Sequence, residues 1–233
     1  MKEYPCYTIR RAASPPPLEA PWDASAWQGA DALTVDSFHP ASSNHRPFTQ
    51  ARMLYDPSGL YGIFRVEDRY VLSTRTEYQS AVCRDACVEF FTEPKAGMGY
   101  FNFEMNCGGT LLASYIEDCT RISDPKRPGQ TFEKYTHLSE ASGAQVRIRS
   151  SMPRRITPEK TEPVTWTLSF HIPKAVLEAF IGPLGNLAGQ EWRGNFHKCA
   201  EDCSHPHWAT WATIGEELNF HKPACFAPLR FAL

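Results

Sequence analysis

The sequence has little of what a membrane-bound, secreted or nucleic-acid-binding protein usually carries. Among its 233 residues no uninterrupted apolar run approaches the roughly 20 residues that a membrane-spanning helix needs. No apolar segment typical of a secretory signal occurs in the first residues, MKEYPCYTIRRAASPPP. A net charge of -2 gives no strong attraction for nucleic acid or for an anionic membrane. We therefore expect a cytoplasmic protein that binds neither nucleic acid nor membranes.

The short motifs that mark several large enzyme classes are also missing. The chain has no phosphate-binding glycine loop followed by lysine, no G-x-S-x-G turn for a nucleophilic serine and no H-E-x-x-H zinc motif. The glycines of MNCGG, residues 105–109, open no helical pattern and are typical of a turn. We expect a protein without catalytic activity.

Proline and glycine, with 19 and 14 residues, divide the chain into short β-like segments. Residues 49–56 and 60–68 flank a Pro-Ser-Gly turn and predict a hairpin, whereas residues 173–182 carry the terminal Pro and Gly of a short helix. Many short strands and one short helix predict an all-β fold, an antiparallel β-sandwich of the jelly-roll or immunoglobulin-like type, as a single domain over residues 1–233. Further strands are expected at residues 86–94, 99–106, 110–118, 145–150, 164–173, 190–198 and 228–231, with a mobile loop at 124–130.

The strand predicted at residues 99–106, GYFNFEMN, has an unusual polar face. Two phenylalanines and a methionine alternate with polar residues, so they share the opposite face. The polar face carries amides, a carboxylate and a phenol, and a second carboxylate lies in a neighbouring predicted strand. Such groups can each bond two hydroxyls of a sugar, although a merely solvated strand face remains the alternative. The residues concerned are Tyr100, Asn102, Glu104, Asn106 and, on the neighbour, Glu89.

The six tryptophans fall into three groups. Two lie in the apolar phase of predicted strands, where core packing is expected. Trp22 and Trp27 follow the proline-rich lead-in and are expected to hold it against the sandwich. The last two lie in an irregular segment, SHPHWATWATIGEE, among histidines. Because an aromatic ring in a loop can present a flat face to a ligand, Trp208 is a candidate stacking platform.

Cysteine and histidine cluster near residue 200, where thiolates and imidazoles at short spacing can hold zinc. The C-x-x-x-C spacing found there is not that of the usual zinc knuckle, and it recurs at Cys83 and Cys87. Buried thiols that pack as small apolar residues are therefore favoured, no stoichiometric zinc is expected at the cluster, and most cysteines are expected to be reduced. The cluster consists of His197, Cys199, Cys203, His205 and His207.

Five segments in a fixed order resemble the family 9 carbohydrate-binding modules and their family 9-like relatives. These are LYGIFRVED, DACVEFFTEP, YFNFEMNCGGTLLASY, WTLSFHIPKAVL and the terminal LNFHKPACFAPLRF. The resemblance covers roughly residues 5–231. The wider group of DOMON-like sandwiches also includes haem-binding redox modules. The resemblance implies a jelly-roll-like sandwich that binds the end unit of a mono- or oligosaccharide without catalysis.

The resemblance also implies a binding site. In the family a sugar unit lies between two tryptophans, and polar side chains hold its hydroxyls. The strand glutamate of the family corresponds to Glu89, the polar positions that follow correspond to Asn102 and Glu104, and a late loop tryptophan corresponds to Trp208. The first stacking tryptophan has no counterpart, since TEYQSAVCRDAC offers only a tyrosine. The predicted carbohydrate site therefore consists of Glu89, Asn102, Glu104, Asn106, Trp208 and Tyr78.

Calcium is the one cofactor that the resemblance suggests, because the family binds it structurally, away from the sugar. A hard cation needs several oxygen ligands, and Glu67, Asp68 and Asp118 at the ends of predicted strands could contribute.

Two other functions remain open at the level of sequence. A haem-binding electron-transfer module would need axial ligands, for which His205, His207 and Met105 are candidates. An enzyme acting on a sugar derivative would need acid–base groups, which Glu104, His197 and His207 could supply.

Overall fold

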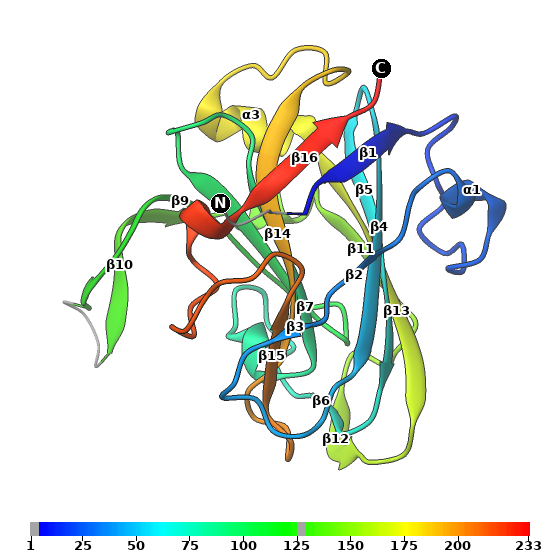
Figure 1. Ribbon diagram of the computed structural model, residues 1–233, viewed down its shortest axis with the longest axis vertical. Helices are drawn as coiled ribbons and strands as arrows, with labels where there is room; N and C mark the ends of the chain where they lie inside the picture. Colours follow the sequence, from blue (N-terminus) through cyan, green and yellow to red (C-terminus); the bar gives the residue numbers. More distant parts are fainter. Residues whose placement is uncertain (1–4, 125–128) are drawn as a thin grey trace.

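β-Strands dominate the computed structural model, which describes residues 5–124 and 129–233 (Figure 1). In chain order the elements are β1 (Tyr7–Arg11), α1 (Ser25–Gln28), β2 (Leu33–Thr34), β3 (Ser37–Phe38), β4 (Phe48–Asp56), β5 (Gly59–Asp68), β6 (Val71–Ser73), the 3-10 helix η1 (Val82–Arg84), β7 (Cys87–Glu93), β8 (Tyr100–Asn106), β9 (Leu111–Ser123), β10 (Gln130–His137), α2 (Glu140–Gly143), β11 (Arg147–Ser150), β12 (Ile156–Lys160), β13 (Val164–Pro173), α3 (Lys174–Ile181), β14 (Glu191–Ala200), β15 (His207–Thr210), the 3-10 helix η2 (Pro223–Cys225) and β16 (Ala227–Phe231).

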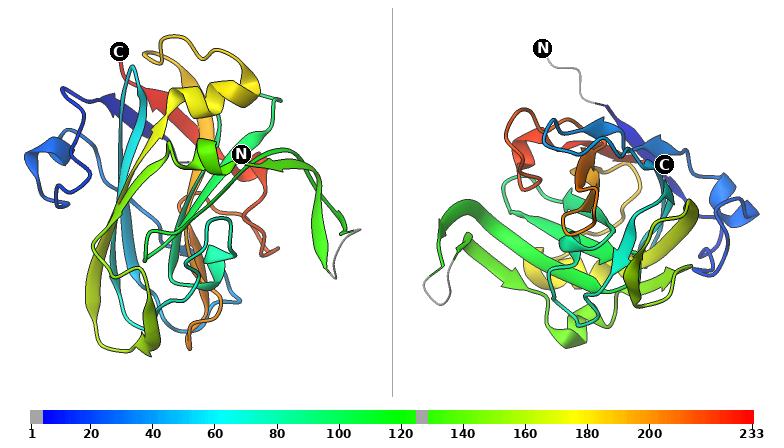
Figure 2. Two further views of the ribbon diagram at one scale, coloured as in Figure 1. Left: turned by 180° about the vertical axis from the view of Figure 1, so that it is seen from behind. Right: turned by 90° about the horizontal axis from the view of Figure 1, so that it is seen from below.

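Most strands join one 14-stranded sheet that folds over so that its two halves face each other (Figure 2). The main path runs β10-β9-β8-β7-β14-β16-β1-β4-β5-β13-β11. β1 links the two layers, because Tyr7–Ile9 pair with β16 and Arg10–Arg11 pair with β4, both in parallel. The prediction of a β-sandwich is confirmed, with the one departure that β1 has parallel neighbours on both sides.

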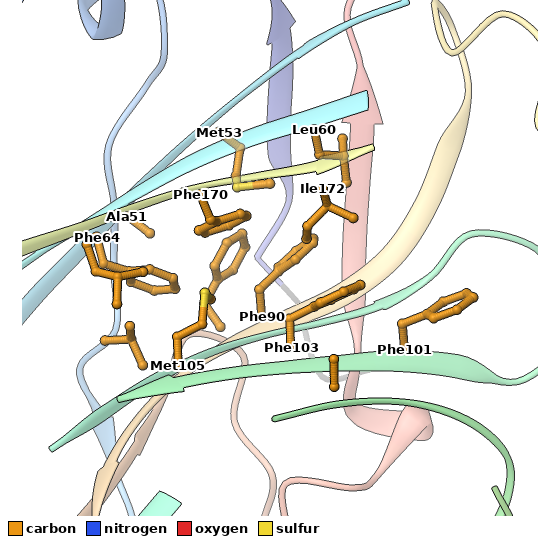
Figure 3. Packing of buried hydrophobic residues seen from close by; sticks show 14 of the residues in the cluster. Ala51, Met53, Leu60, Phe64, Phe90, Phe101, Phe103, Met105, Phe170 and Ile172 are labelled. Carbon is orange, nitrogen blue, oxygen red and sulfur yellow. The ribbon is translucent and has the colours of Figure 1, made fainter. Parts of the chain in front are cut away.

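Aromatic side chains fill the space between the layers (Figure 3). Phe90 on β7 and Phe103 on β8 point into this space, and the ring centroids of Phe90 and of Phe170 on β13 are 6.2 Å apart. Phe101 and Met105 share this buried face, as the alternation of the sequence predicted. Burial of this apolar face fixes the register of β8, because a slip of one residue would turn it outward.

The predicted hairpin and helix are both present. β4 and β5 are joined by a tight turn in which Asp56 pairs with Gly59, and the Asp56 carboxylate accepts hydrogen bonds from the turn. A Cβ at Gly59 would lie 2.1 Å from the carbonyl oxygen of Ile172, so only glycine fits there. α3 begins after Pro173 and ends before Gly182, which has a φ of 71°. The one-turn helices α1 and α2 were not predicted.

The lead-in packs on the outer face of β4 and β5, as predicted from its tryptophans. Trp22 and Trp27 form a separate buried cluster with Leu54 and Tyr61. The guanidinium of Arg52 lies 4.3 Å from the centre of the Trp22 ring. Within the described residues, no helix is both long and apolar enough to cross a membrane. The centre of the loop predicted at residues 124–130 lies outside the described residues.

Each of the eight cysteines, all in the described part of the chain, has a free thiol. If the protein is cytoplasmic, as we expect, titration of the denatured, unreduced protein should find nearly all of these thiols free. Recovery of only a few thiols would instead indicate disulfides and an oxidising compartment.

Candidate functional site

The polar side chains of β8 and β7 meet side chains of β14 and β15 on the outer face of one layer. In the antiparallel register Glu104 faces Glu89, and Glu89 faces His197. Cβ atoms of directly opposed residues lie about 4.5–5.5 Å apart, so the two carboxyls are neighbours. On β15, Trp208 faces Cys199, two residues beyond His197 and on the same side of β14.

This polar face is buried, so the alternative of a merely solvated strand face is wrong. Glu89 and Asn102 are each 2% exposed and Glu104 is 5% exposed. The chain between β15 and β16 returns over the face, where Phe220 packs against Cys87 and Cys199 and Phe226 packs on the neighbouring aromatic cluster. Carboxyls buried in this way are uncommon without a structural partner or a ligand.

Burial raises the pKa of both carboxyls. For Glu104 burial is the main cause, and a hydrogen bond donated by Asn102 Nδ2 to Oε1 at 2.7 Å opposes it, so that the pKa of Glu104 is about 7. Burial, followed by the charge of Glu104, raises the pKa of Glu89 well above its usual value, although the Cys199 thiol donates to Glu89 Oε1 at 3.2 Å. Two adjacent buried carboxyls cannot both ionise easily. The pair therefore retains a proton near neutral pH and can both donate and accept hydrogen bonds.

A cavity of about 270 Å³ opens onto this carboxyl pair. This volume is just below the range of about 300–1,000 Å³ for ligand pockets and suits a small ligand. Its aromatic walls are Trp208, which is half-buried, and Phe220, whose ring stacks on His197 with centroids 4.2 Å apart. The lining residues are Cys83, Glu89, Glu104, Arg121, Cys199, Glu201, Trp208, Leu218, Asn219, Phe220 and His221.

His197 supports the aromatic wall from below. Its ring is fully buried, and neither ring nitrogen has a hydrogen-bond partner among the described residues. Burial lowers the pKa of His197 well below its usual value, so the imidazole is neutral. It therefore presents a flat, uncharged surface on which Phe220 rests.

Three of the six predicted carbohydrate-binding residues, Glu89, Glu104 and Trp208, line this cavity. Asn102 lies behind Glu104 and does not line the cavity; its amide donates to Glu104 and its Oδ1 accepts from the backbone of Ser114. It therefore orients Glu104 rather than lining the cavity.

The other two predicted residues lie elsewhere. The polar atoms of Asn106 are engaged in structural hydrogen bonds, since its amide donates to Asp85 and its Oδ1 accepts from the backbone of Thr110. Tyr78 donates to the carbonyl of Leu138 and lines a separate hollow of about 440 Å³ that is also lined by Arg154. We therefore leave Asn106 and Tyr78 out of the candidate site, because hydrogen bonds that are distant in sequence hold them away from the carboxyl pair.

The sequence did not predict Phe220 as part of the site. Phe220 forms the second aromatic wall of the cavity, the role predicted for Tyr78. Phe220 lies in LNFHKPACFAPLRF, a segment that carried the family resemblance. No local pattern shows that this segment folds over β7 and β14. His221, in the same segment, was missed for this reason, and Arg121 near the end of the long strand β9 was missed as well.

The oxygen ligands considered for calcium do not converge. The Asp68 carboxylate is engaged by His45 Nε2 at 2.8 Å and by Lys198 Nζ at 3.5 Å. Glu67 pairs with Arg65 at 2.8 Å. Asp118 is exposed on β9 and accepts from the backbone of Thr120. These three carboxylates therefore do not form a calcium site together, and calcium binding stays a prediction.

The histidines considered for haem or acid–base chemistry do not all lie on one face of the sheet. His207 bonds Lys198 Nζ at 2.7 Å on the inner side of β14, opposite to His197. His205 stacks on Tyr70 with centroids 3.7 Å apart, and Met105 lies in the core between the layers. His205 and His207 both lie beside His45, with ring centroids 6.4 and 5.2 Å from it, but Met105 lies apart from them in the core. The proposed acid–base group does not meet at one place either, because His207 lies across the sheet from Glu104 and His197.

The sequence model of carbohydrate-binding family 9 matches residues 26–231, which include the carboxyl pair and both aromatic walls. The chain belongs to carbohydrate-binding family 9. No curated protein matches the sequence.

Solved structures share the fold of this chain. A protein of Bacteroides uniformis ATCC 8492, described as a "putative carbohydrate-binding protein", is 25% identical with a TM-score of 0.83, and the match covers 98% of this chain and 100% of that one. A family 9 module of Caldicellulosiruptor kristjanssonii in complex with glucose has a TM-score of 0.61 at 11% identity, covering 96% and 95% of the two chains. The same kind of module in complex with cellotriose gives the same score and identity, covering 97% and 93%. At 11% identity the likeness concerns the fold alone.

Proposed function

We propose that this family 9 protein binds a carbohydrate end unit, without catalysis, in the cavity over Glu89 and Glu104. The observation that carries the proposal is a buried pair of carboxyls that opens to a small cavity with two aromatic walls. Family membership supports a sugar as the ligand, as do the glucose and cellotriose bound by structural neighbours.

The chemistry of the cavity matches that of a sugar ring. The apolar C–H face of a pyranose stacks on an indole or phenyl ring, here Trp208 or Phe220. Each sugar hydroxyl can donate and accept a hydrogen bond, and a carboxyl pair that holds one proton can do both in return. Arg121 and Asn219 at the rim add donors. The volume of about 270 Å³ favours a single sugar unit, with any remaining chain outside.

Glycoside hydrolases also use a pair of carboxyl groups for catalysis, so hydrolysis of glycans by this protein must be measured. The proposal predicts no hydrolysis of cello-oligosaccharides or of other glycans that the protein binds. The cavity argues against hydrolysis, because Glu89 is engaged by the Cys199 thiol and Glu104 is engaged by Asn102. Release of reducing ends that disappears in Glu104→Gln would establish an enzyme instead.

Replacement of Trp208 by alanine should weaken sugar binding about tenfold, because one stacking surface is lost. Calorimetric titration with glucose, cellobiose and cellotriose measures the effect. Trp208→Phe is the matched variant and should keep most of the affinity. Equal affinity in the parent and in Trp208→Ala would remove this wall from the site.

A further inference from the structure

Two cysteines and a glutamate meet at the floor of the cavity. In residues 5–124 and 129–233, they form the one group of three potential metal-ligating side chains whose ligand atoms all lie within 4.8 Å of one another. The group consists of Cys87, Glu89 and Cys199, and each member is at most 2% exposed.

Strand pairing produces this group from residues that are far apart in sequence. Cys87 on β7 faces Cys199 on β14, and Glu89 lies two residues further along the same face of β7. The Cys199 Sγ atom is 3.2 Å from Glu89 Oε1. Each cysteine belongs to a C-x-x-x-C segment, but the second cysteine of the later segment, Cys203, packs in the core between the layers. The juxtaposition is therefore across strands rather than within either motif.

We propose that Cys87, Glu89 and Cys199 bind a thiophilic divalent cation, for which zinc is the natural probe. Zinc takes sulfur at about 2.3 Å and carboxylate oxygen at about 2.0–2.2 Å, so tetrahedral ligands lie about 3.5–3.8 Å apart. The separation of 3.2 Å between Cys199 Sγ and Glu89 Oε1 needs only a small adjustment to meet this geometry. Two thiolates exclude calcium and magnesium, which prefer oxygen ligands.

The surroundings allow an ion to enter and leave one coordination position free. Glu89 and Cys199 both line the cavity, so the group is reached from its open side. Three protein ligands with a fourth position toward a cavity match the open type of zinc site. Binding releases a proton from each thiol and takes Glu89 as the carboxylate, so the proton retained by the carboxyl pair stays on Glu104 or is released as well. Two thiolates and one carboxylate then carry three negative charges, one more than a divalent ion neutralises. The positive charge of Arg121, which lines the same cavity, offsets the remaining negative charge.

This site differs from the local cluster of residues 197–207, at which no zinc was predicted. That cluster is divided by the sheet, since Cys199 lies on the outer face whereas His207 contacts Lys198 on the inner side. Replacement of His207 should therefore leave the proposed metal affinity unchanged. The site shares Glu89 with the proposed sugar site, but a metal titration contains no sugar, so either proposal can fail without the other.

Cobalt titration of the reduced, chelator-treated chain tests the site. One equivalent of Co²⁺ should produce the intense near-ultraviolet absorption of a cobalt–thiolate bond, and Zn²⁺ should abolish it by displacement. Cys87→Ala and Cys199→Ala should each lower the affinity for Co²⁺ at least tenfold, whereas the control Cys225→Ser should bind as the parent does.

A second measurement needs no variant and covers the case in which an alanine variant does not fold. In a urea concentration just below the unfolding transition, where transient opening exposes the buried Cys87 and Cys199, one equivalent of Zn²⁺ should slow their alkylation, as read by peptide mass mapping, without slowing alkylation of the exposed Cys6. Absence of the thiolate absorption, or equal alkylation with and without Zn²⁺, would overturn the proposal. Absorption that persists in both alanine variants would do the same.

Discussion

Replacement of Lys198 by methionine should lower the free energy of unfolding by about 3–5 kcal/mol, because it leaves a buried carboxylate without its cation. Lys198 is fully buried, and its Nζ lies 3.5 Å from Asp68 Oδ2. Since Lys198 lies on β14 and Asp68 on β5, the ion pair joins the two layers. Urea unfolding at pH 7 measures the loss, which corresponds to a fall in Tm of roughly 6–20 °C for a chain of this size.

The pH dependence of this loss identifies its cause. Burial alone would raise the pKa of Asp68, but the charge of Lys198 and the hydrogen bond from His45 bring it down to about 2. A lowered carboxyl pKa stabilises the fold above the unfolded value of about 3.9, and this stabilisation is lost as the pH falls toward 2. In Lys198→Met the buried Asp68 takes up a proton more readily. The difference between parent and variant should therefore be largest at pH 7 and shrink by pH 3.5.

Two controls separate the charge from the loss of packing. Lys160→Met removes a lysine whose ion-pair distance is 3.8 Å at the surface, and it should change stability by less than about 1 kcal/mol. Asp68→Asn combined with Lys198→Met removes both charges and should recover part of the loss. A Lys198→Met variant as stable as the parent at pH 7 would show that Asp68 is neutral or paired by other groups.

Replacement of Glu104 by glutamine should weaken sugar binding about ten- to a hundredfold. Hydrogen bonds to a charged group contribute about 1.5–3 kcal/mol, and 1.4 kcal/mol corresponds to tenfold in affinity. Glutamine keeps the oxygen that accepts from Asn102 Nδ2 but replaces the second carboxyl oxygen by an NH₂ group. The cavity then loses an acceptor for a sugar hydroxyl while its shape is preserved.

The stability of Glu104→Gln should not fall, which distinguishes a binding residue from a structural one. Burial holds the pKa of Glu104 at about 7, so the fold already disfavours its charged form, and a neutral amide suits the same position. Glu133→Gln on the exposed β10 is the matched control and should bind sugar as the parent does. If Glu104→Gln binds every sugar ligand with unchanged affinity, Glu104 does not contact the sugar.

Sequence periodicity predicted the parts of the fold that depend on local alternation. The polar row of β8 and its apolar partner face were both visible, because one face of a strand must be buried in the core. The pairing of Glu104 with Glu89 followed from the expectation of neighbouring strands. The burial of this polar row was not predictable, since it depends on Phe220 returning from more than a hundred residues away.

Side chains that meet across layers or distant strands left no signal in the sequence. The strand that contains Lys198 was predicted from its sequence, but no residue near Lys198 in the sequence predicts its ion pair with Asp68. Cys87 and Cys199 come together through the pairing of β7 with β14 rather than through the spacing of either cysteine motif. Tyr78 was chosen for its position along the chain, whereas its hydrogen bond to Leu138 holds it in another hollow.

A crystal structure of the protein with bound cellotriose would test the central claim most directly. We predict one terminal sugar ring in the cavity over Glu89 and Glu104, stacked on Trp208 or Phe220, with at least one hydroxyl within hydrogen-bond distance of Glu104. The rest of the chain should extend past Arg121 or Asn219 into solvent. A sugar seated instead in the hollow beside Tyr78 and Arg154, with the carboxyl pair untouched, would contradict the account.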